Sequence, residues 1–199
     1  MKQEPIFKTI LGTEWENLGD IIKRHYFLRE RSSDNICVSG EMSEIYHSLP
    51  AKALIPIALI FGAVVPYKGK RVPVDVYYSA DSKNANIYWD RVFKFKHREF
   101  HFKSHMEPVK HQEVIEFVRF GLGIKLRVSC EGGALVFRDI GYIWRILGFK
   151  IPLPGRWLMG RIYVEERPID HRQFSMKMEL RHPLLGMLFK YSGKFSLPS

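Results

Sequence analysis

After Ile36, apolar and polar residues alternate along much of the chain. The alternation is clearest in four segments, which are residues 72–78, 124–130, 174–180 and 187–195. One side of each segment is mainly Val, Ile, Leu, Met, Phe or Tyr, and the other side is mainly charged or polar. A period of two with one apolar side predicts antiparallel strands that pack on one face.

Turn signals separate the predicted strands. Gly132-Gly133 is typical of a tight hairpin, and residues 79–86 form a longer polar connection. We count nine or ten strands, and an antiparallel sheet of that size tends to curl or close. The expected fold is mainly β with minor α: a curled antiparallel sheet or barrel, calycin-like or half-barrel. The alternative is a helix-grip fold of the sterol-transfer kind, which the strand-like ending at 187–195 disfavours.

The N-terminal segment follows a different period. Apolar residues recur at spacings of three and four, which predicts helix over the first 28 residues; they are Leu11, Trp15, Leu18, Ile21 and Ile22. Gly12 would end a first short helix, and Thr13 is a suitable N-cap for a second. We expect residues 1–30 to pack as a helical segment on the sheet of one domain that spans 1–199.

An uncharged stretch runs from Ala53 to Pro66. As a helix its fourteen residues would be about 21 Å long, whereas the hydrocarbon core of a bilayer needs about 30 Å. Ser48-Leu49-Pro50 offers an earlier start, which would leave Pro56 inside the helix. Because a helix that is apolar all round is usually buried, we expect a buried apolar helix over the open end of the barrel. Contact with a membrane surface is the alternative.

The composition of the chain constrains fold and function less than the pattern of apolar and polar positions does. The chain has 31 basic and 21 acidic residues, a net charge of +10 that would suit an anionic membrane surface, but the charges are spread out. The first ten residues lack the apolar core of a secretory signal, and Cys37 and Cys130 lie far apart. We expect a cytoplasmic protein, free or peripheral at the membrane, with two reduced thiols.

Polar residues on the apolar sides of strands are the candidates for a pocket. Arg91 lies among the aromatic residues of segment 89–95, and Glu166 and His182 end two other apolar faces. With the aromatic and methionine residues beside them, the predicted pocket residues are Trp89, Arg91, Phe93, Phe102, Glu166, Met178, His182 and Tyr191.

The roles of Arg91 and His182 stay open at this point. The Arg91 guanidinium could bind the carboxylate or phosphate head of a ligand, pair with Glu166 or another acid, or lie at an edge open to water. His182 is expected to be a hydrogen-bonded structural residue. General acid–base chemistry is the alternative for it, although no nucleophile motif accompanies it.

Three motif-like patterns are rejected. The series His97, His101 and His105 lies in a strand-like segment, where positions four apart are about 13 Å apart, so we expect no metal site. Segment 94–103 alternates basic and aromatic residues on opposite faces, so nucleic-acid binding is not expected. Segment 121–125 lacks the G-K-[ST] ending of a phosphate loop, and we expect no cofactor.

Motifs along nearly the whole chain resemble those of a bacterial family known only as a domain of unknown function. They are "LGTEWENL" with His25, "PYKGKRVPVDV", "WDRVFKF", "GFKIPLPGRWL", Glu165-Glu166, "DHRQFSMKMEL" and "HPLLGMLFKYSG". The chain departs from the family in being richer in lysine. Because the family domain also occurs behind a saccharopine-dehydrogenase-like NAD-binding domain, the resemblance implies an intracellular protein and an NAD-binding oxidoreductase as a partner. It implies no activity.

Together these features predict non-catalytic binding of a hydrophobic or amphipathic, lipid-like small molecule in a barrel pocket. One alternative is an enzyme acting on such a ligand, which would require Glu166, His182 and Tyr191 to converge. Another is an accessory module that binds through a basic outer face.

Overall fold

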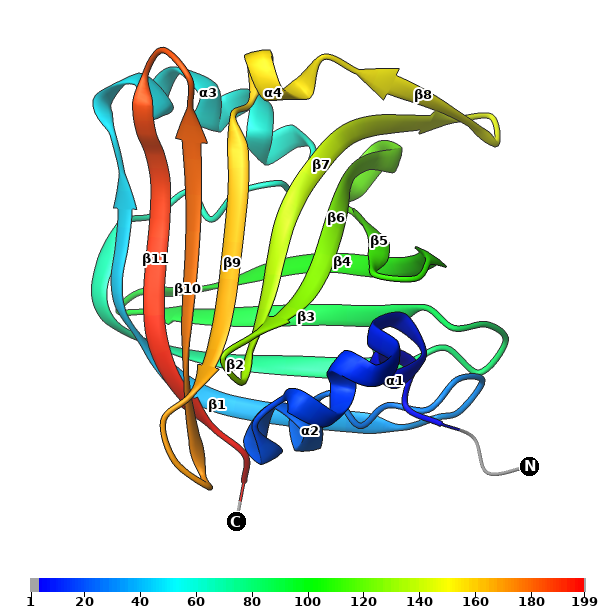
Figure 1. Ribbon diagram of the computed structural model, residues 1–199. Coiled ribbons are helices and arrows are strands. Elements are labelled where there is room, and N and C mark those ends of the chain that lie inside the picture. Colours follow the sequence, from blue (N-terminus) through cyan, green and yellow to red (C-terminus); the bar gives the residue numbers. More distant parts are fainter. Residues whose placement is uncertain (1–3, 199) are drawn as a thin grey trace.

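The computed structural model describes residues 4–198 and is dominated by one antiparallel sheet (Figure 1). Its strands are β1 (Asn35–His47), β2 (Gly69–Ala80), β3 (Ile87–Phe95), β4 (Arg98–Lys110), β5 (Glu113–Phe117), β6 (Leu122–Glu131), β7 (Ala134–Ile146), β8 (Phe149–Leu153), β9 (Arg161–Pro168), β10 (Gln173–His182) and β11 (Gly186–Ser196). The helices are α1 (Ile6–Leu11), α2 (Asp20–His25), α3 (Leu49–Ile60) and α4 (Gly155–Leu158), with 3₁₀ helices η1 (Gly12–Asn17) and η2 (Arg119–Gly121).

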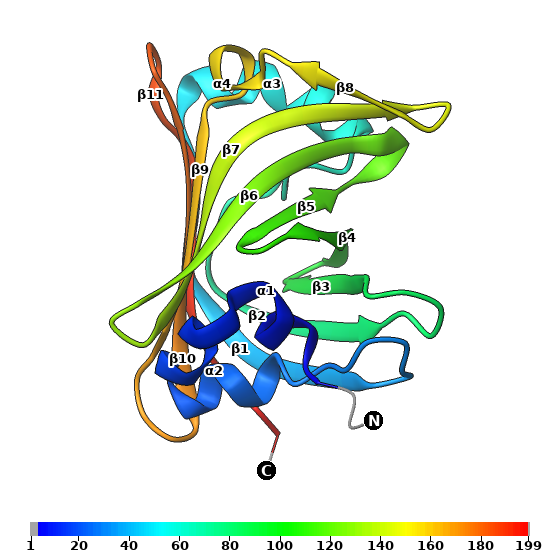
Figure 2. The same ribbon diagram turned by 45° about the vertical axis from the view of Figure 1, so that its right-hand side comes forward.

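Ten of the strands form a closed barrel. Strands β1 to β6 are neighbours in sequence order, β7 pairs with β6 and β9, and β11 pairs back with β1. Strand β8 pairs with the second half of β7 and lies outside the ring (Figure 2). The expected barrel is therefore confirmed in its closed form. The helix-grip alternative is wrong, because the last element is strand β11 rather than a long helix.

Local sequence explains the hairpins and the inner face. Gly132 and Gly133 both have positive φ, 56° and 80°, as the tight turn between β6 and β7 requires. On β2 the alternating residues Val72, Val74 and Val76 are buried, while Pro73 between them is exposed. The period-two pattern thus places the apolar sides of the strands inside the barrel.

A β-bulge changes the inner face of β1. The register against β11 shifts between Met42 and Glu44, so one extra residue is inserted. Val38 and Met42 are buried before the bulge, and Ile45 and His47 are buried after it. The bulge therefore turns His47 inward, which simple alternation from Met42 would not do.

The N-terminal helices close the lower end of the barrel (Figure 1). Their apolar side chains join the main core; the most buried are Ile6, Phe7, Ile10, Leu11, Ile21 and Ile22. Gly19 allows close packing at this end, because its N–H donates to the Gly133 carbonyl at 3.0 Å and a Cβ there would lie 2.7 Å from Pro168. The lower end is filled rather than open.

The segmentation of this N-terminal region differs from the expectation. Helix α1 ends at Gly12, with φ +58°, as predicted. Thr13, however, lies inside η1 and does not cap an α-helix, and the second α-helix begins after Gly19. The apolar spacing was compatible with one continuous helix, but packing around the barrel end requires the chain to turn.

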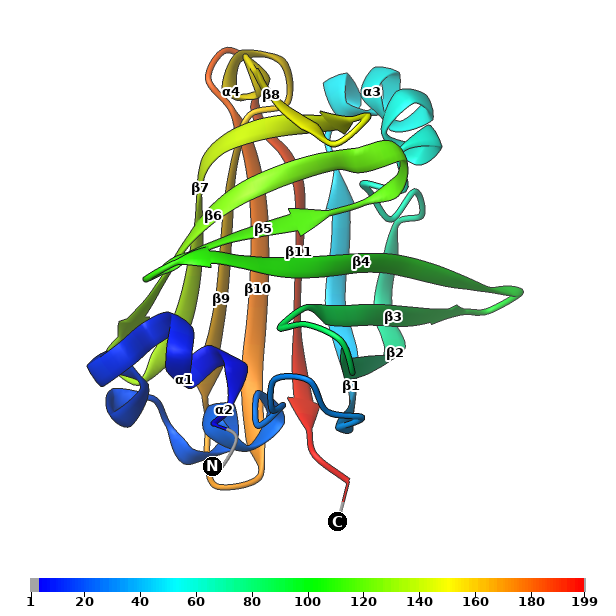
Figure 3. The ribbon, with the colours of Figure 1, turned by 90° about the vertical axis from the view of Figure 1, so that its right-hand side faces the viewer.

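Helix α3 lies at the upper end of the barrel, as Figures 1 and 3 show. It begins where the sequence indicated: Ser48 is the N-cap and accepts a hydrogen bond from the Ala51 amide at 3.3 Å. The prediction of a buried helix is wrong. Ala51 is its one buried residue, while Leu49 is 78% exposed. Helix α3 lies across the opening with one apolar face outward, and nothing within residues 4–198 covers that face.

None of the helices within residues 4–198 combines the length and the apolar character that a bilayer span needs.

Candidate functional site

A chamber of about 430 Å³ lies beneath α3 at the upper end of the barrel. One wall is the inward face of α3, formed by Ala51, Leu54, Ile55 and Ala58. Most of the remaining lining comes from the ends of strands and from the α4 region; it includes Leu122, Tyr142, Trp144, Leu153, Leu158, Met159, Leu180, Leu188 and Phe189. The lining is almost wholly apolar, so this outer chamber suits a hydrocarbon or ring system rather than a charged group.

A smaller inner chamber of about 80 Å³ lies deeper in the barrel. Residues that line both chambers place them next to each other; these are Ala63, Val118, Ile124, Ile162 and Met178. Polar residues are concentrated in the inner chamber, where Arg91, Glu116 and Glu166 reach its wall. The interior is therefore amphipathic, with an apolar outer part and a polar inner part.

Arg91 forms a closed network inside the barrel. Its Nη1 donates to Ser104 Oγ at 3.0 Å, and its Nη2 donates to Glu116 Oε1 at 3.1 Å. Ser104 Oγ also donates to Glu116 Oε1 at 2.7 Å. The guanidinium lies 4.4 Å from the Trp89 ring centre and 5.0 Å from that of Phe102, so aromatic faces surround it. The charge of Arg91 is balanced without a ligand.

A second buried pair joins the N-terminal helices to the barrel. His25 Nε2 lies 2.8 Å from Glu166 Oε2, and its Nδ1 lies 3.2 Å from the carbonyl oxygen of Ile21. Both partner oxygens are hydrogen-bond acceptors. The His25 ring also stacks on Phe174 at 4.4 Å between centroids. Glu166 thus has a structural partner that is not Arg91.

Two buried nitrogens within residues 4–198 have no hydrogen-bond partner: His47 Nε2 and Trp89 Nε1. His47 lines the outer chamber and Trp89 lines the inner one. Burial lowers the pKa of His47, so its ring is neutral at pH 7. Unpaired buried polar groups are costly, and both of these belong to residues that line a chamber.

The structure separates the eight predicted pocket residues into two groups. Six line the inner chamber: Trp89, Arg91, Phe102, Glu166, Met178 and Tyr191. Phe93 is fully buried in the core but is not in the lining of either chamber. His182 lies at the upper end of β10, where its Nε2 is 2.7 Å from the Trp157 carbonyl and its Nδ1 accepts from the Leu184 amide at 3.2 Å. Those contacts are structural.

The arrangement does not support catalysis by Glu166, His182 and Tyr191. Glu166 pairs with Met176 on β10, six residues from His182, which corresponds to about 20 Å along a strand. Burial raises the pKa of Tyr191 to about 12, so its hydroxyl stays protonated at neutral pH. The groups do not converge, and Tyr191 is a poor base.

Both cysteines are free thiols, as expected. Cys37 and Cys130 are partly buried, and burial raises the pKa of each thiol. A thiol with a raised pKa forms little thiolate at neutral pH, so neither has the character of a nucleophile.

The polar residues of the interior that were not predicted include Ser104, Glu116 and His47. Ser104 shares a strand face with Phe102 and Met106, so strict alternation along β4 could have revealed it. Glu116 lies on the short strand β5, where five residues give too little pattern to assign a face. His47 was hidden by the bulge in β1.

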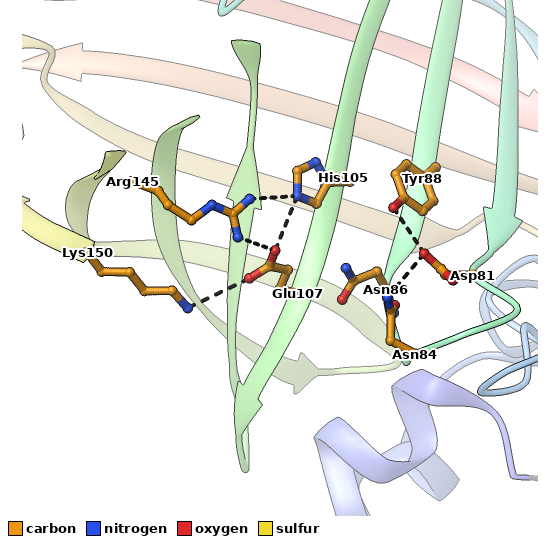
Figure 4. Close-up of polar contacts among 8 residues, drawn as sticks. All are labelled: Asp81, Asn84, Asn86, Tyr88, His105, Glu107, Arg145 and Lys150. Atoms are coloured by element: carbon orange, nitrogen blue, oxygen red, sulfur yellow. Dashed lines mark hydrogen bonds and ion pairs between the residues drawn. The ribbon is translucent and has the colours of Figure 1, made fainter. Parts of the chain in front are cut away.

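The outer surface carries a separate polar network over β4, β7 and β8 (Figure 4). Arg145 Nη1 donates to Glu107 at 2.6 Å, Lys150 lies 3.7 Å from the same carboxylate, and His105 Nε2 lies 3.3 Å from it. The His105 ring stacks on Phe117, which is fully buried although it lies outside the main core. This network covers a small outer apolar cluster.

Nearby, Asp81 accepts hydrogen bonds from Tyr88 at 3.0 Å and from Asn84 at 3.2 Å, which orders the connection between β2 and β3 (Figure 4). His101 pairs with Asp90 on the outer face, and His105 points outward as expected. Among residues 4–198 there is no group of three or more His, Cys, Asp or Glu side chains that could hold a metal ion.

The comparison with curated proteins found no match. A family model described as "Domain of unknown function (DUF4166)" matches residues 18–195, which covers every strand of the barrel except the last residue of β11. The N-terminal boundary of the match falls between η1 and α2. The chain therefore belongs to the DUF4166 family.

Proposed function

We propose that this protein binds a hydrophobic or amphipathic, lipid-like small molecule in the barrel without catalysing a reaction on it. The observation that carries the proposal is the outer chamber of about 430 Å³ with its almost wholly apolar lining. That volume falls within the range of about 300–1,000 Å³ typical of small-molecule sites. Protein interiors are otherwise packed densely, so an apolar space of this size favours a ligand over a core.

The unpaired nitrogens indicate the polar part of the ligand. His47, with its unpaired Nε2, is in the lining of the outer chamber, and Trp89, with its unpaired Nε1, is in the lining of the inner chamber. Trp89 Nε1 only donates, so it needs an acceptor such as a carbonyl, ether or hydroxyl oxygen. Because Glu116 already balances Arg91, the geometry favours an uncharged polar group over the acidic head considered from the sequence.

The first test is native mass spectrometry of freshly purified protein, followed by organic extraction. We expect a bound apolar mass that extraction releases. Recovery of the protein without bound mass, together with failure to bind a dansyl-labelled fatty acid, would contradict the proposal.

A matched pair of variants localises the ligand. Ala58→Trp places an indole in the outer chamber, whereas Ala53→Trp places the same side chain on the exposed, opposite face of α3. We expect Ala58→Trp to weaken dansyl fatty-acid binding at least about tenfold, since the indole fills the space, and Ala53→Trp to leave it unchanged. Equal effects of the two variants would show that the probe binds elsewhere.

A partnership with an NAD-binding oxidoreductase, implied by the resemblance noted above, is a separate proposal. It predicts that such an enzyme co-purifies with the full chain and that the complex survives Ala58→Trp, which alters the pocket alone. Loss of the complex in that variant would instead link the partner to ligand occupancy.

A further inference from the structure

The upper end of the barrel exposes large apolar side chains from four separate segments. Leu49 and Ile60 of α3, Leu147 and Phe149 at the β7–β8 turn, Trp157 of α4 and Leu184 at the β10–β11 turn are each at least 61% exposed. We call these six residues the apolar rim. Figures 1 and 3 show α3, α4, β8 and the β10–β11 turn at the same end of the molecule. Exposed apolar groups gathered in this way mark an interaction surface.

The chain segments that carry the rim contain basic residues but no acidic ones. Segments 48–66, 119–123, 146–160 and 183–188 contain Lys52, Arg119, Lys150 and Arg156 and no acidic residue. Lys150 and Arg156 pair with Glu107 and Asp139, whereas Lys52 and Arg119 form no ion pair within residues 4–198. The opposite end of the barrel has a mixed set of charges that includes Glu14, Glu16 and Asp20. The rim end therefore combines six exposed apolar side chains with positive charge.

We propose that the apolar rim docks this protein on an anionic lipid bilayer, with Lys52 and Arg119 contacting the head groups. Trp157 and Phe149 are side chains suited to the boundary between head groups and acyl chains. Helix α3 is too short to span the bilayer but can lie in that boundary, which accounts for its outward apolar face. Docking stands independently of what the chambers hold.

The geometry also places the outer chamber toward the bilayer. The inward face of α3 and Leu158 of α4 line that chamber, and the outward parts of the same helices belong to the rim end. A lipid-like ligand could therefore pass between bilayer and chamber beside α3 without crossing water. This second step rests on the proposed function, whereas docking does not.

The test is co-sedimentation of the full chain with vesicles of phosphatidylcholine alone or with about 30% phosphatidylserine. We expect binding to the anionic vesicles that weakens as salt is raised. Leu147→Glu/Phe149→Glu should weaken it at least about tenfold, since two inserted apolar groups become charged. Phe27→Glu is the matched control, because Phe27 is 53% exposed at the closed end, and it should bind like the wild type.

A second variant separates the electrostatic part. Lys52→Gln/Arg119→Gln should reduce the preference for anionic over neutral vesicles by about tenfold. Failure of the wild-type protein to bind anionic vesicles, or equal binding by the double Glu variant and Phe27→Glu, would overturn the proposal. A wild-type dimer that Leu147→Glu/Phe149→Glu dissociates, with no vesicle binding, would show that a second copy covers the rim and would also overturn it.

Failure of the docking proposal can be distinguished from failure of the proposed ligand binding. Dansyl fatty-acid binding without vesicles reports the chambers, and Leu147→Glu/Phe149→Glu should leave it unchanged because neither residue lines them. Vesicle binding with no fatty-acid binding would retain docking and reject the pocket. Fatty-acid binding with no vesicle binding would retain the pocket and reject docking.

Discussion

At the scale of single residues, Arg91 shows how the barrel accommodates a charge in its interior. Its guanidinium lies against two aromatic rings and hydrogen-bonds to Ser104 and Glu116. A buried ion pair of this kind adds little net stability, but removing one partner leaves the other charge uncompensated. Arg91→Ala is consequently a poor test of ligand binding, because its first effect falls on the fold.

The Arg91–Glu116 pair leads to a stability prediction. Arg91→Met should lower the free energy of unfolding by about 2–4 kcal/mol, since Glu116 then lacks its cation inside the barrel. Adding Glu116→Gln should recover most of that loss. Urea unfolding of the wild type, both single variants and the double variant measures the coupling. Additive losses in the double variant would contradict the pairing.

Glu107 on the outer face leads to a pH prediction. Partial burial acts to raise its pKa, but hydrogen bonds from Arg145 and His105 and the charge of Lys150 outweigh this and hold the pKa below its ordinary value. A folded-state pKa below the unfolded one gives stability that is present above the unfolded pKa and lost as pH falls through the folded pKa.

Glu107→Gln should therefore lower the free energy of unfolding at pH 7, by less than about 1 kcal/mol because the network is partly exposed. The difference from the wild type should shrink as the pH falls below about 4, where the wild-type carboxylate also loses its charge. Urea unfolding of the wild type and of Glu107→Gln across this pH range tests the prediction. A difference that stays constant with pH would mean that the charge of Glu107 is not responsible.

At the scale of elements, α3 differs from the strands in how it is held. The Ser48 amide at its start donates to the Leu188 carbonyl at 2.9 Å, and the Arg119 amide donates to the Phe61 carbonyl just after its end, also at 2.9 Å. Between these points its inward face meets the outer chamber rather than a packed core. An element supported mainly at its ends opens at lower free energy than the barrel around it.

Removing the N-cap of α3 tests whether this helix opens independently of the barrel strands. Ser48→Ala loses the hydrogen bond to the Ala51 amide and should cost about 1 kcal/mol locally. We expect faster hydrogen exchange at the amides of α3 and unchanged exchange in β11. Ser43→Ala, at an exposed serine of β1, is the control. Faster exchange throughout the barrel would show that α3 and the strands open together.

At the scale of the whole molecule, the two ends of the barrel differ. The lower end is filled by α1, η1 and α2, whose apolar residues join the core, while the upper end keeps the outer chamber beneath α3. Strand β7 contributes to this difference. It pairs with β9 through Leu135–Arg138 and then with β8 through Tyr142–Ile146, so the wall diverges toward the upper end. Asp139 lies at the divergence and accepts from Arg156 and from the Ile162 amide, each at 2.9 Å.

The sequence by itself determined the strands and their apolar sides, because alternation follows from the local geometry of an extended chain. It located the Gly132-Gly133 turn and the start of α3 at Ser48 for the same reason, since turns and caps depend on a few neighbouring residues. It also placed Arg91 among aromatic side chains.

Only the tertiary structure decided the rest. The choice of Glu116 as partner of Arg91, the inward turn of His47 at a bulge and the closure of β1 on β11 depend on residues far apart in the chain. Whether α3 is buried, and whether the barrel contains a chamber, depend on the summed volume of the side chains that all strands direct into the interior. A local pattern carries no information about that sum, which is why α3 was expected to be buried although one of its faces is exposed.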